Sequence, residues 1–147
     1  MNEISPVFQL YIGSTVVLGL NLLLLANNTA LTRAKATEVV NPEDIRINPK
    51  AVVVYESGNE RTERYRRAHR NALENIPLFL ITGFLLTQTQ IGFTFAGVIF
   101  GVFTLTRVMH SICYVSGLQP WRTASFAIGA VVQLVVLGYL GYATFIG

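Results

Sequence analysis

The uneven distribution of charge along this chain restricts the folds that it can adopt. Nine of the eleven Lys and Arg residues, and all of the acidic residues except Glu3, fall within residues 33–74. From Asn75 to the end of the sequence, the only charged residues are Arg107 and Arg122. Charged residues make up 13% of the chain, whereas about 25% is typical of soluble proteins. This distribution predicts an integral membrane protein with one polar connection.

Four segments match the length of membrane-spanning helices, because crossing about 30 Å of hydrocarbon takes about 20 helical residues. We therefore expect an all-α integral membrane fold, a four-transmembrane-helix bundle that forms a single domain over residues 1–147. The expected spans are at about 6–26, 66–89, 93–116 and 120–145, with a polar connection at 27–65. The apolar part of the second span, Ile76 to Leu86, is too short alone, so its helix is predicted to begin well before Asn75.

The first apolar run must be distinguished from a cleaved secretory signal. Residues 1–6 contain an acid and no Lys or Arg, and the apolar run is longer than a signal core, so we expect a retained helix. Cys113 is the only cysteine, which argues against an intrachain disulfide and a Cys-based metal site, and no metal ligands are predicted. The net charge of +3 suits an anionic lipid surface or an anionic ligand. No segment resembles a nucleic-acid-binding motif.

Lys and Arg placement predicts the orientation, because these residues are enriched in cytoplasmic loops. Residues 27–70 hold nine of them, the turn at 87–92 holds none, and the turn at 116–122 holds one. We expect the connection and the last turn on the cytoplasmic face, with both termini opposite. Within the connection, NPED predicts a helix start with Asn41 as N-cap, and VVVY is compatible with a short extended segment.

Two groups of polar residues recur at the spacing i, i+3, i+4 and i+7, which places each group on one face of a helix. The first polar stripe consists of Arg67, Arg70, Asn71 and Glu74. The second polar stripe, within the third span, consists of Arg107, His110, Ser111 and Tyr114. A charge at the bilayer centre costs roughly 2.5–3.5 kcal/mol on insertion scales. Both stripes are therefore predicted to face the bundle interior or an interface between subunits.

The charges of the last three helices do not balance. Four arginines (Arg67, Arg70, Arg107 and Arg122) accompany a single acid, Glu74, which can pair with only one of them. The remaining positive charges predict an electropositive pocket at the cytoplasmic depth of the membrane. An anionic ligand would complete it, such as glutathione, with two carboxylates and a thiolate, or an anionic lipid headgroup.

Several polar residues have simpler explanations. Arg64 and Arg66 can be anchors that extend to the lipid surface, while Arg61 and Glu63 are predicted to be solvated. His69 lies on a different face from the first polar stripe and is predicted to be structural. Two residues are expected to form interhelical hydrogen bonds, Asn21 and Gln133.

The sequence RRAHRNALENIP resembles the second-helix signature of the MAPEG family, the membrane-associated proteins in eicosanoid and glutathione metabolism. NPED lies upstream and RVMHSICYVSGLQPWRT downstream, in the family's order and spacing, so the resemblance covers nearly the whole chain. It is similar to the branch of microsomal glutathione transferases and microsomal prostaglandin E synthase. The resemblance implies a homotrimer that binds glutathione between neighbouring subunits near the cytoplasmic face.

The resemblance also implies which residues form the site. The expected glutathione contacts are Arg33, Arg67, Arg70, Asn71, Glu74, His110, Tyr114, Arg122 and Phe126. Arg122 and Thr123 are expected beside the thiol, and Asp44 matches an acid proposed to take part in prostaglandin E synthase catalysis. Where the prostaglandin synthase pattern has a tyrosine, this chain has Phe126, which keeps a stacking surface and lacks the hydroxyl.

The expected chemistry is activation of the glutathione thiol. A cysteine thiol has a pKa of about 8.5, and the thiolate is the nucleophile. The charge of Arg122, the hydroxyl of Thr123 and the N-terminus of the fourth helix are expected to lower that pKa. We predict a glutathione transferase or peroxidase acting on lipophilic electrophiles or lipid hydroperoxides. The alternatives are a non-catalytic lipid-binding member, a prostaglandin-type isomerase and a small transporter. We expect the protein in the bacterial inner membrane or the endoplasmic reticulum.

Overall fold

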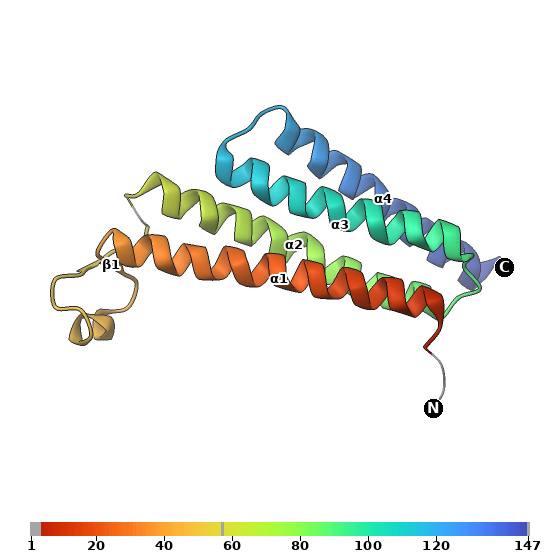
Figure 1. Ribbon diagram of the computed structural model, residues 1–147, viewed down its shortest axis with the longest axis horizontal. Helices are drawn as coiled ribbons and strands as arrows, with labels where there is room; N and C mark the ends of the chain where they lie inside the picture. The colour runs from red at the N-terminus through yellow and green to blue at the C-terminus, as the bar shows by residue number, and fades with distance from the viewer. Residues whose placement is uncertain (1–3, 57, 147) are drawn as a thin grey trace.

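The computed structural model describes residues 4–56 and 58–146, which form a bundle of four long helices (Figure 1). The helices are α1 (Pro6–Lys35), α2 (Glu60–Thr87), α3 (Phe93–Ser116) and α4 (Trp121–Phe145). They alternate in direction, so the start of α1 and the end of α4 lie at one end of the bundle (Figure 1). The connection and the α3–α4 turn lie at the other end, as predicted. The outermost residues of the predicted domain, 1–3 and 147, fall outside the described ranges.

The ends of α1 and α2 differ from the predicted spans, whereas those of α3 and α4 agree with them. α1 continues to Lys35 instead of ending near Ala26, because no Pro or Gly interrupts residues 27–35. α2 begins at Glu60, and the Oδ1 atom of Asn59 accepts from the N–H of Thr62 at 3.1 Å. The start of α2 within the charged stretch is thus confirmed. The connection is shorter than the predicted 27–65, because α1 ends only at Lys35 and α2 already begins at Glu60.

The connection contains the two short elements that the sequence indicated. A 3₁₀ helix, η1, spans Pro42–Arg46 and follows Asn41 at the N-cap position. β1 (Glu38–Val39) pairs in parallel with β2 (Val52–Val53). The helix start at NPED and the extended segment at VVVY are confirmed, although the helix is a single short 3₁₀ element. The side chain of Asn41 makes no capping hydrogen bond and instead lies 3.5 Å from Asp44 Oδ2.

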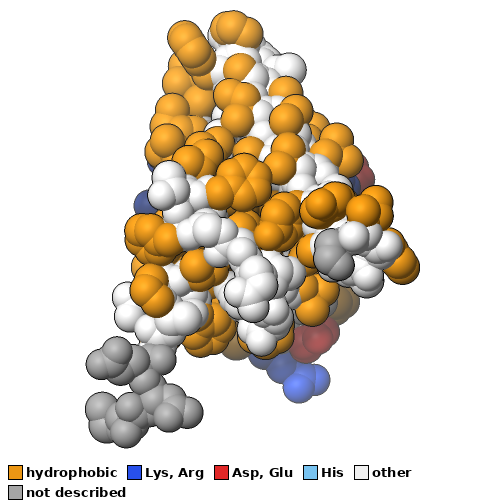
Figure 2. Space-filling view, turned by 90° about the vertical axis from the view of Figure 1, so that its right-hand side faces the viewer, with side chains coloured by type: hydrophobic (Ala, Val, Ile, Leu, Met, Phe, Trp, Pro, Cys, Tyr) orange, Lys and Arg blue, Asp and Glu red, His pale blue; other side chains and the backbone are white. Residues whose placement is uncertain are grey.

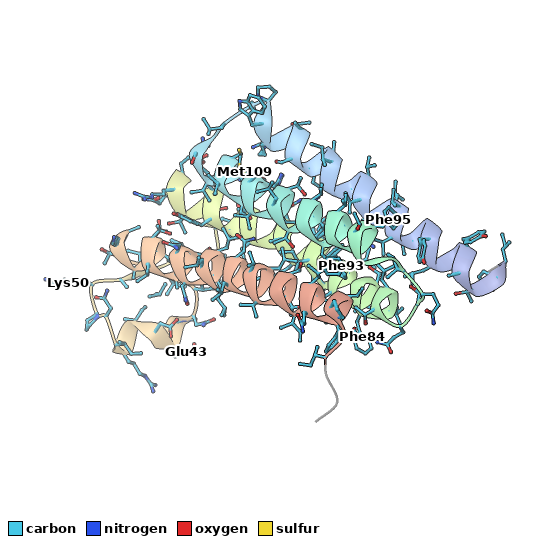
Figure 3. All side chains as sticks on the ribbon, turned by 45° about the vertical axis from the view of Figure 1, so that its right-hand side comes forward. Glu43, Lys50, Phe84, Phe93, Phe95 and Met109 are labelled. Atoms are coloured by element: carbon cyan, nitrogen blue, oxygen red, sulfur yellow. The ribbon has the colours of Figure 1, made fainter. Side chains whose placement is uncertain are left out.

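Three of the described helices, α1, α3 and α4, are long and apolar enough to span a membrane. α2 does not reach the same hydropathy, because its first half is charged. The end of the bundle that carries both termini presents hydrophobic and uncharged side chains (Figure 2). Phe84, Phe93 and Phe95 lie toward this end, whereas Glu43 and Lys50 extend from the connection at the opposite end (Figure 3). Charge is thus separated along the bundle axis.

Two interhelical hydrogen bonds confirm the roles predicted for Asn21 and Gln133. Asn21 Nδ2 on α1 donates to Ser111 Oγ on α3 at 3.0 Å. Gln133 Nε2 on α4 donates to Thr82 Oγ1 on α2 at 3.1 Å. In lipid, polar side chains on transmembrane helices are commonly paired across helices in this way.

An aromatic stack joins α2 to α3 in the core. The rings of Phe79 and Phe103 are parallel, with an interplanar angle of 5° and centroids 3.6 Å apart. Phe100 packs edge-on against Phe79 at 5.8 Å. All three side chains are buried, so they depend on one another for packing.

The Phe79→Ala variant is expected to be destabilised by about 3 kcal/mol, at the low end of the range for buried aromatics. The low end applies because lipid replaces water outside the bundle, so the loss is mainly one of packing. Thermal unfolding in detergent measures the effect, and Phe145→Ala, at an 85% exposed position, is the control. Equal melting temperatures for the two variants would contradict the role assigned to the stack.

Candidate functional site

The second polar stripe faces the interior of the bundle, as predicted. Arg107 is 2% exposed, His110 6% and Ser111 5%, while Tyr114 is partly exposed. Arg107 and His110 are directed toward α4, because their polar atoms meet backbone carbonyls of that helix, whereas Ser111 accepts from Asn21 of α1. The polar groups of Arg107 and His110 therefore link α3 to α4.

Arg107 and His110 each bind one carbonyl of α4. Arg107 Nη2 donates to Phe126 O at 3.0 Å, and its guanidinium lies 5.3 Å and 5.2 Å from the ring centroids of Phe103 and Phe126. His110 Nδ1 lies 2.9 Å from Arg122 O. Because a carbonyl only accepts, the proton is on Nδ1. The other ring nitrogen, Nε2, is buried and has no hydrogen-bond partner.

Arg122 and Thr123 lie together in the first turn of α4. The Arg122 guanidinium is 4.8 Å from the ring centroid of Tyr114. With its amide oxygen facing Arg122, Gln119 accepts from Nε at 3.3 Å and Nη2 at 2.6 Å, and its amide nitrogen donates to Thr123 Oγ1 at 3.1 Å. The predicted pair is thus bridged by Gln119, a residue whose side chain the sequence analysis missed. The sequence signal for this contact was its spacing, because Gln119 precedes Arg122 by three residues and Thr123 by four.

The backbone at the start of α4 differs from the expectation in one respect. The N–H of Arg122 donates to Leu118 O at 3.1 Å, so the turn already uses this group. The N–H of Arg122 is therefore not free to bind an anion, whereas the guanidinium of Arg122 and the hydroxyl of Thr123 can attract one.

The first polar stripe faces away from the four-helix bundle, which excludes one of the two predicted environments. The Arg70 and Glu74 side chains are 73% and 61% exposed, with Nε and Oε1 4.0 Å apart. α2 packs inward through a different face, which includes Ala68, Ala72 and Ile76. These residues are small or apolar and allow close packing, so the polar residues lie outside. Asn71 is partly buried, and its Oδ1 has no hydrogen-bond partner.

Acids at the start of α2 change the predicted charge balance. Arg67 Nη2 is 3.1 Å from Glu60 Oε1, so this arginine is paired with an acid that the charge count left out. Glu63 was predicted to be solvated, but it is only 9% exposed and is ion-paired with Arg66. Arg61 is exposed, as predicted.

The remaining arginines fall into two classes. Arg64 and Arg66, whose anchoring role stays a prediction, are ion-paired with acids of their own helix, Arg64 at 3.0 Å from Glu60 and Arg66 at 2.7 Å from Glu63. In the described part of the chain, no carboxylate lies within 4.0 Å of Arg107 or Arg122. These two charges lack an anionic partner, as the sequence predicted.

Arg33 and Asp44 line one pocket of about 380 Å³ between the end of α1 and the connection. The Nε atom of Arg33 is buried without a hydrogen-bond partner. Only the resemblance had predicted that Arg33 and Asp44 belong to one site. The pocket offers both a cation and an acid at the end of the bundle that holds the connection.

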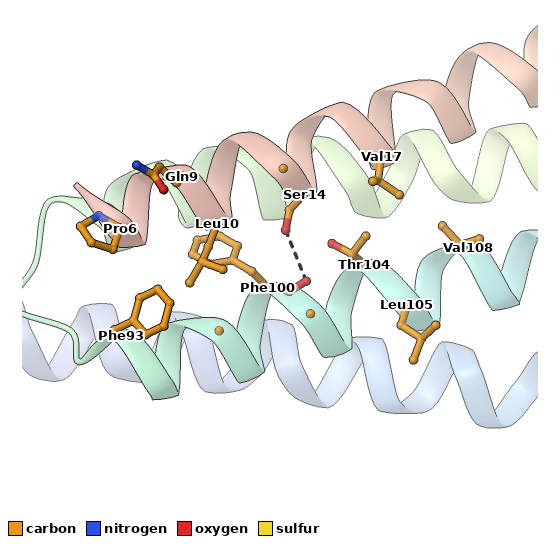
Figure 4. Close-up of a pocket in the computed structure, with 13 residues that line it drawn as sticks. Pro6, Gln9, Leu10, Ser14, Val17, Phe93, Phe100, Thr104, Leu105 and Val108 are labelled. Carbon is orange, nitrogen blue, oxygen red and sulfur yellow. Dashed lines mark hydrogen bonds between the residues drawn. The ribbon is translucent and has the colours of Figure 1, made fainter. Parts of the chain in front are cut away.

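The predicted site residues thus form three groups: the Arg33–Asp44 pocket, the first polar stripe, and the residues around Arg122. Among the described residues, no hydrogen bond or ion pair joins one group to another. A separate groove of about 610 Å³ lies between α1 and α3, where Ser14 Oγ is 3.5 Å from Phe100 O (Figure 4). None of the predicted site residues lines this groove.

Comparison with known proteins identifies related sequences. The model of the MAPEG family matches residues 11–142. Microsomal glutathione S-transferase 1 of Sus scrofa and that of Homo sapiens are each 35% identical to the chain over 136 residues, which cover 90% of the chain and 86% of the relative. Prostaglandin E synthase of Macaca fascicularis is 29% identical over 125 residues, which cover 84% of the chain and 81% of that protein.

Proposed function

The chain belongs to the MAPEG family, and we propose that it is a membrane-bound glutathione transferase that activates glutathione as a thiolate. The observation that carries this proposal is the arrangement at the start of α4. There, Arg122 has no carboxylate partner in the described chain, and Gln119 bridges it to the hydroxyl of Thr123. An unneutralised guanidinium beside a hydroxyl can stabilise the developing sulfur anion through charge and one hydrogen bond.

The proposed chemistry begins with loss of the thiol proton. Each unit by which the pKa of the bound thiol falls corresponds to about 1.4 kcal/mol of preferential thiolate stabilisation. In conjugation, the sulfur forms a bond to an electrophilic carbon and the leaving group departs with its electron pair. In peroxide reduction, two glutathione molecules are oxidised to the disulfide, while the hydroperoxide is reduced to an alcohol and water.

The arginines away from the thiol are assigned to binding. We assign Arg67, Arg70 and Arg33 to the two glutathione carboxylates, since the guanidinium fork suits bidentate pairing. Glu74 is assigned to the ammonium group. His110, Tyr114 and Phe126 would form the wall beside the peptide, with Asn71 adding a polar contact, and Asp44 would assist acid–base chemistry.

A homotrimer would bring the three groups of site residues together. Among the residues that the structure describes, no hydrogen bond or ion pair links the groups, and the first polar stripe is exposed on α2, which this proposal places in the membrane. A neighbouring subunit that covers this face would remove the charged stripe from lipid. In this proposal α2 is the fourth span and the site lies near the cytoplasmic face of the bacterial inner membrane or the endoplasmic reticulum. Lipophilic substrates would enter from the bilayer.

Turnover by the purified protein tests the proposed function. With glutathione and chlorodinitrobenzene, we expect saturable conjugate formation, and with cumene hydroperoxide, formation of glutathione disulfide. A transporter would instead give flux of labelled glutathione into liposomes without thiol chemistry. A non-catalytic lipid-binding protein would give neither. Phe126 lacks the tyrosine hydroxyl of the prostaglandin synthase pattern, so we expect prostaglandin endoperoxide isomerisation to be weaker than conjugation.

The hydroxyl of Thr123 is expected to stabilise the thiolate. The Thr123→Val variant keeps the side-chain shape and loses the donor, and a hydrogen bond to a charged group contributes about 1.5–3 kcal/mol. We therefore expect thiolate formation at a fixed pH to fall by about tenfold. The ultraviolet absorbance of the thiolate measures this, and the Thr123→Ser variant, which keeps a hydroxyl, should remain close to wild type. Equal absorbance in all three proteins would exclude this role.

A further inference from the structure

Arg107 is the least exposed arginine among the described residues, and its surroundings are unusual for a ligand-binding side chain. It is 2% exposed, and its guanidinium lies between the rings of Phe103 and Phe126. Its Nη2 atom donates to Phe126 O. Its Nε and Nη1 atoms are buried without a hydrogen-bond partner. The side chain is enclosed by protein and is directed at the second turn of α4.

Gly129 makes this approach possible. A Cβ atom at this position would collide with Nη2 of Arg107 and lie 2.7 Å from its Nε and 2.9 Å from its Cζ. Any other residue at this site would therefore displace the guanidinium from the surface of α4. The glycine lies three residues after Phe126, so both contacts of Arg107 fall on the same face of α4.

A second contact fixes the same helix one turn earlier. His110 donates to Arg122 O, and Arg107 donates to Phe126 O. The two carbonyls are four residues apart, so they lie one above the other on α4. Two donors of α3 on one line of α4 restrict both rotation and sliding of α4. The residues whose placement depends on that rotation include Arg122 and Thr123.

We propose that Arg107 is a positioning residue: by binding Phe126 O against Gly129, it sets the rotation of α4 and so the place of Arg122 beside the glutathione thiol. This inference rests on the proposed function of Arg122. It assigns to Arg107 no contact with glutathione. It also explains why a buried charge is retained at a cost in lipid, since a planar guanidinium can stack between two rings and donate to a carbonyl at once.

Two variants separate positioning from the electrostatic effect of the charge. Arg107→Met removes the charge and the donor, while Gly129→Ala keeps Arg107 and displaces it. Gly138→Ala on the same helix is the matched control, because an added Cβ there has nothing within 4 Å. The readouts are glutathione affinity, measured by equilibrium binding, and the pH midpoint of thiolate formation, measured by ultraviolet absorbance on the folded fraction.

We expect both Arg107→Met and Gly129→Ala to raise the midpoint by about one pH unit or more, which is about tenfold less thiolate at a given pH. Measured at a pH well below the wild-type midpoint, where the bound thiol is protonated, glutathione affinity should stay close to that of wild type, and Gly138→Ala should match wild type in both readouts. A wild-type midpoint in Gly129→Ala would overturn the proposal, even if Arg107→Met does not fold. A parallel loss of affinity and thiolate would also overturn it, in favour of a ligand contact or a general structural role. If wild type itself forms no thiolate, the proposed function fails first.

Discussion

Replacing Arg122 with Ala is expected to abolish detectable thiolate formation and to lower kcat/KM by about 10²–10³-fold, the usual effect of losing one donor to a developing anion. Arg122 has no carboxylate partner in the described chain, so its charge is available to a ligand. Its guanidinium is held over Tyr114 and by Gln119. A cation fixed in this way stabilises an anion without reorganisation during the reaction.

The decrease should appear mainly in kcat, because the thiolate is needed for chemistry more than for binding. Arg122→Lys should recover part of the activity, since it restores a charge without the planar fork. Arg46→Ala, which removes an exposed arginine of the connection, is the control for net charge. An Arg122→Ala variant that keeps the thiolate absorbance would show that another group ionises the thiol.

Replacing both Arg67 and Arg70 with Gln is expected to weaken glutathione binding by at least about a hundredfold. Hydrogen bonds to charged groups contribute about 1.5–3 kcal/mol each, and the variant removes two such donors. Arg70 is the more available of the two, because its nearest acid, Glu74, is 4.0 Å away and both side chains are largely exposed. Arg67 must exchange Glu60 for the ligand carboxylate.

The matched control is the double variant Arg46→Gln and Arg61→Gln, which removes the same charge from two exposed positions. Equilibrium binding of glutathione at two salt concentrations compares the variants. Wild-type affinity should fall as salt rises, because the first polar stripe is exposed enough to be screened. If the control weakens binding as much as the stripe variant, the stripe acts only through general charge and the assigned contacts are wrong.

The sequence could predict the helices of this fold because their signals are local. The apolar runs, the turn residues near Gly117 and the charged start of α2 each indicate one element. The predicted first span is shorter than α1, because the apolar run defines the membrane-embedded part, whereas a helix continues until the backbone is interrupted. Residues 27–35 are mostly polar and are helix-compatible, so the helix extends past the expected hydrocarbon boundary.

The site was only partly predictable, because periodicity assigns residues to one face without showing what covers that face. The second polar stripe is buried within the bundle, whereas the first lies on its outer surface. Ala68 and Ala72 were the available sign, since small residues favour close helix packing in membranes. The contribution of Gly129 was not predictable, because its value comes from the guanidinium of another helix.

The pH titration of glutathione bound to the wild-type protein tests the central claim most directly. The titration follows the ultraviolet absorbance of the thiolate at saturating glutathione. Our account predicts a midpoint clearly below the value of about 8.5 that is ordinary for a cysteine thiol. A midpoint at or above that value, or the absence of a thiolate signal from protein that binds glutathione, would contradict it.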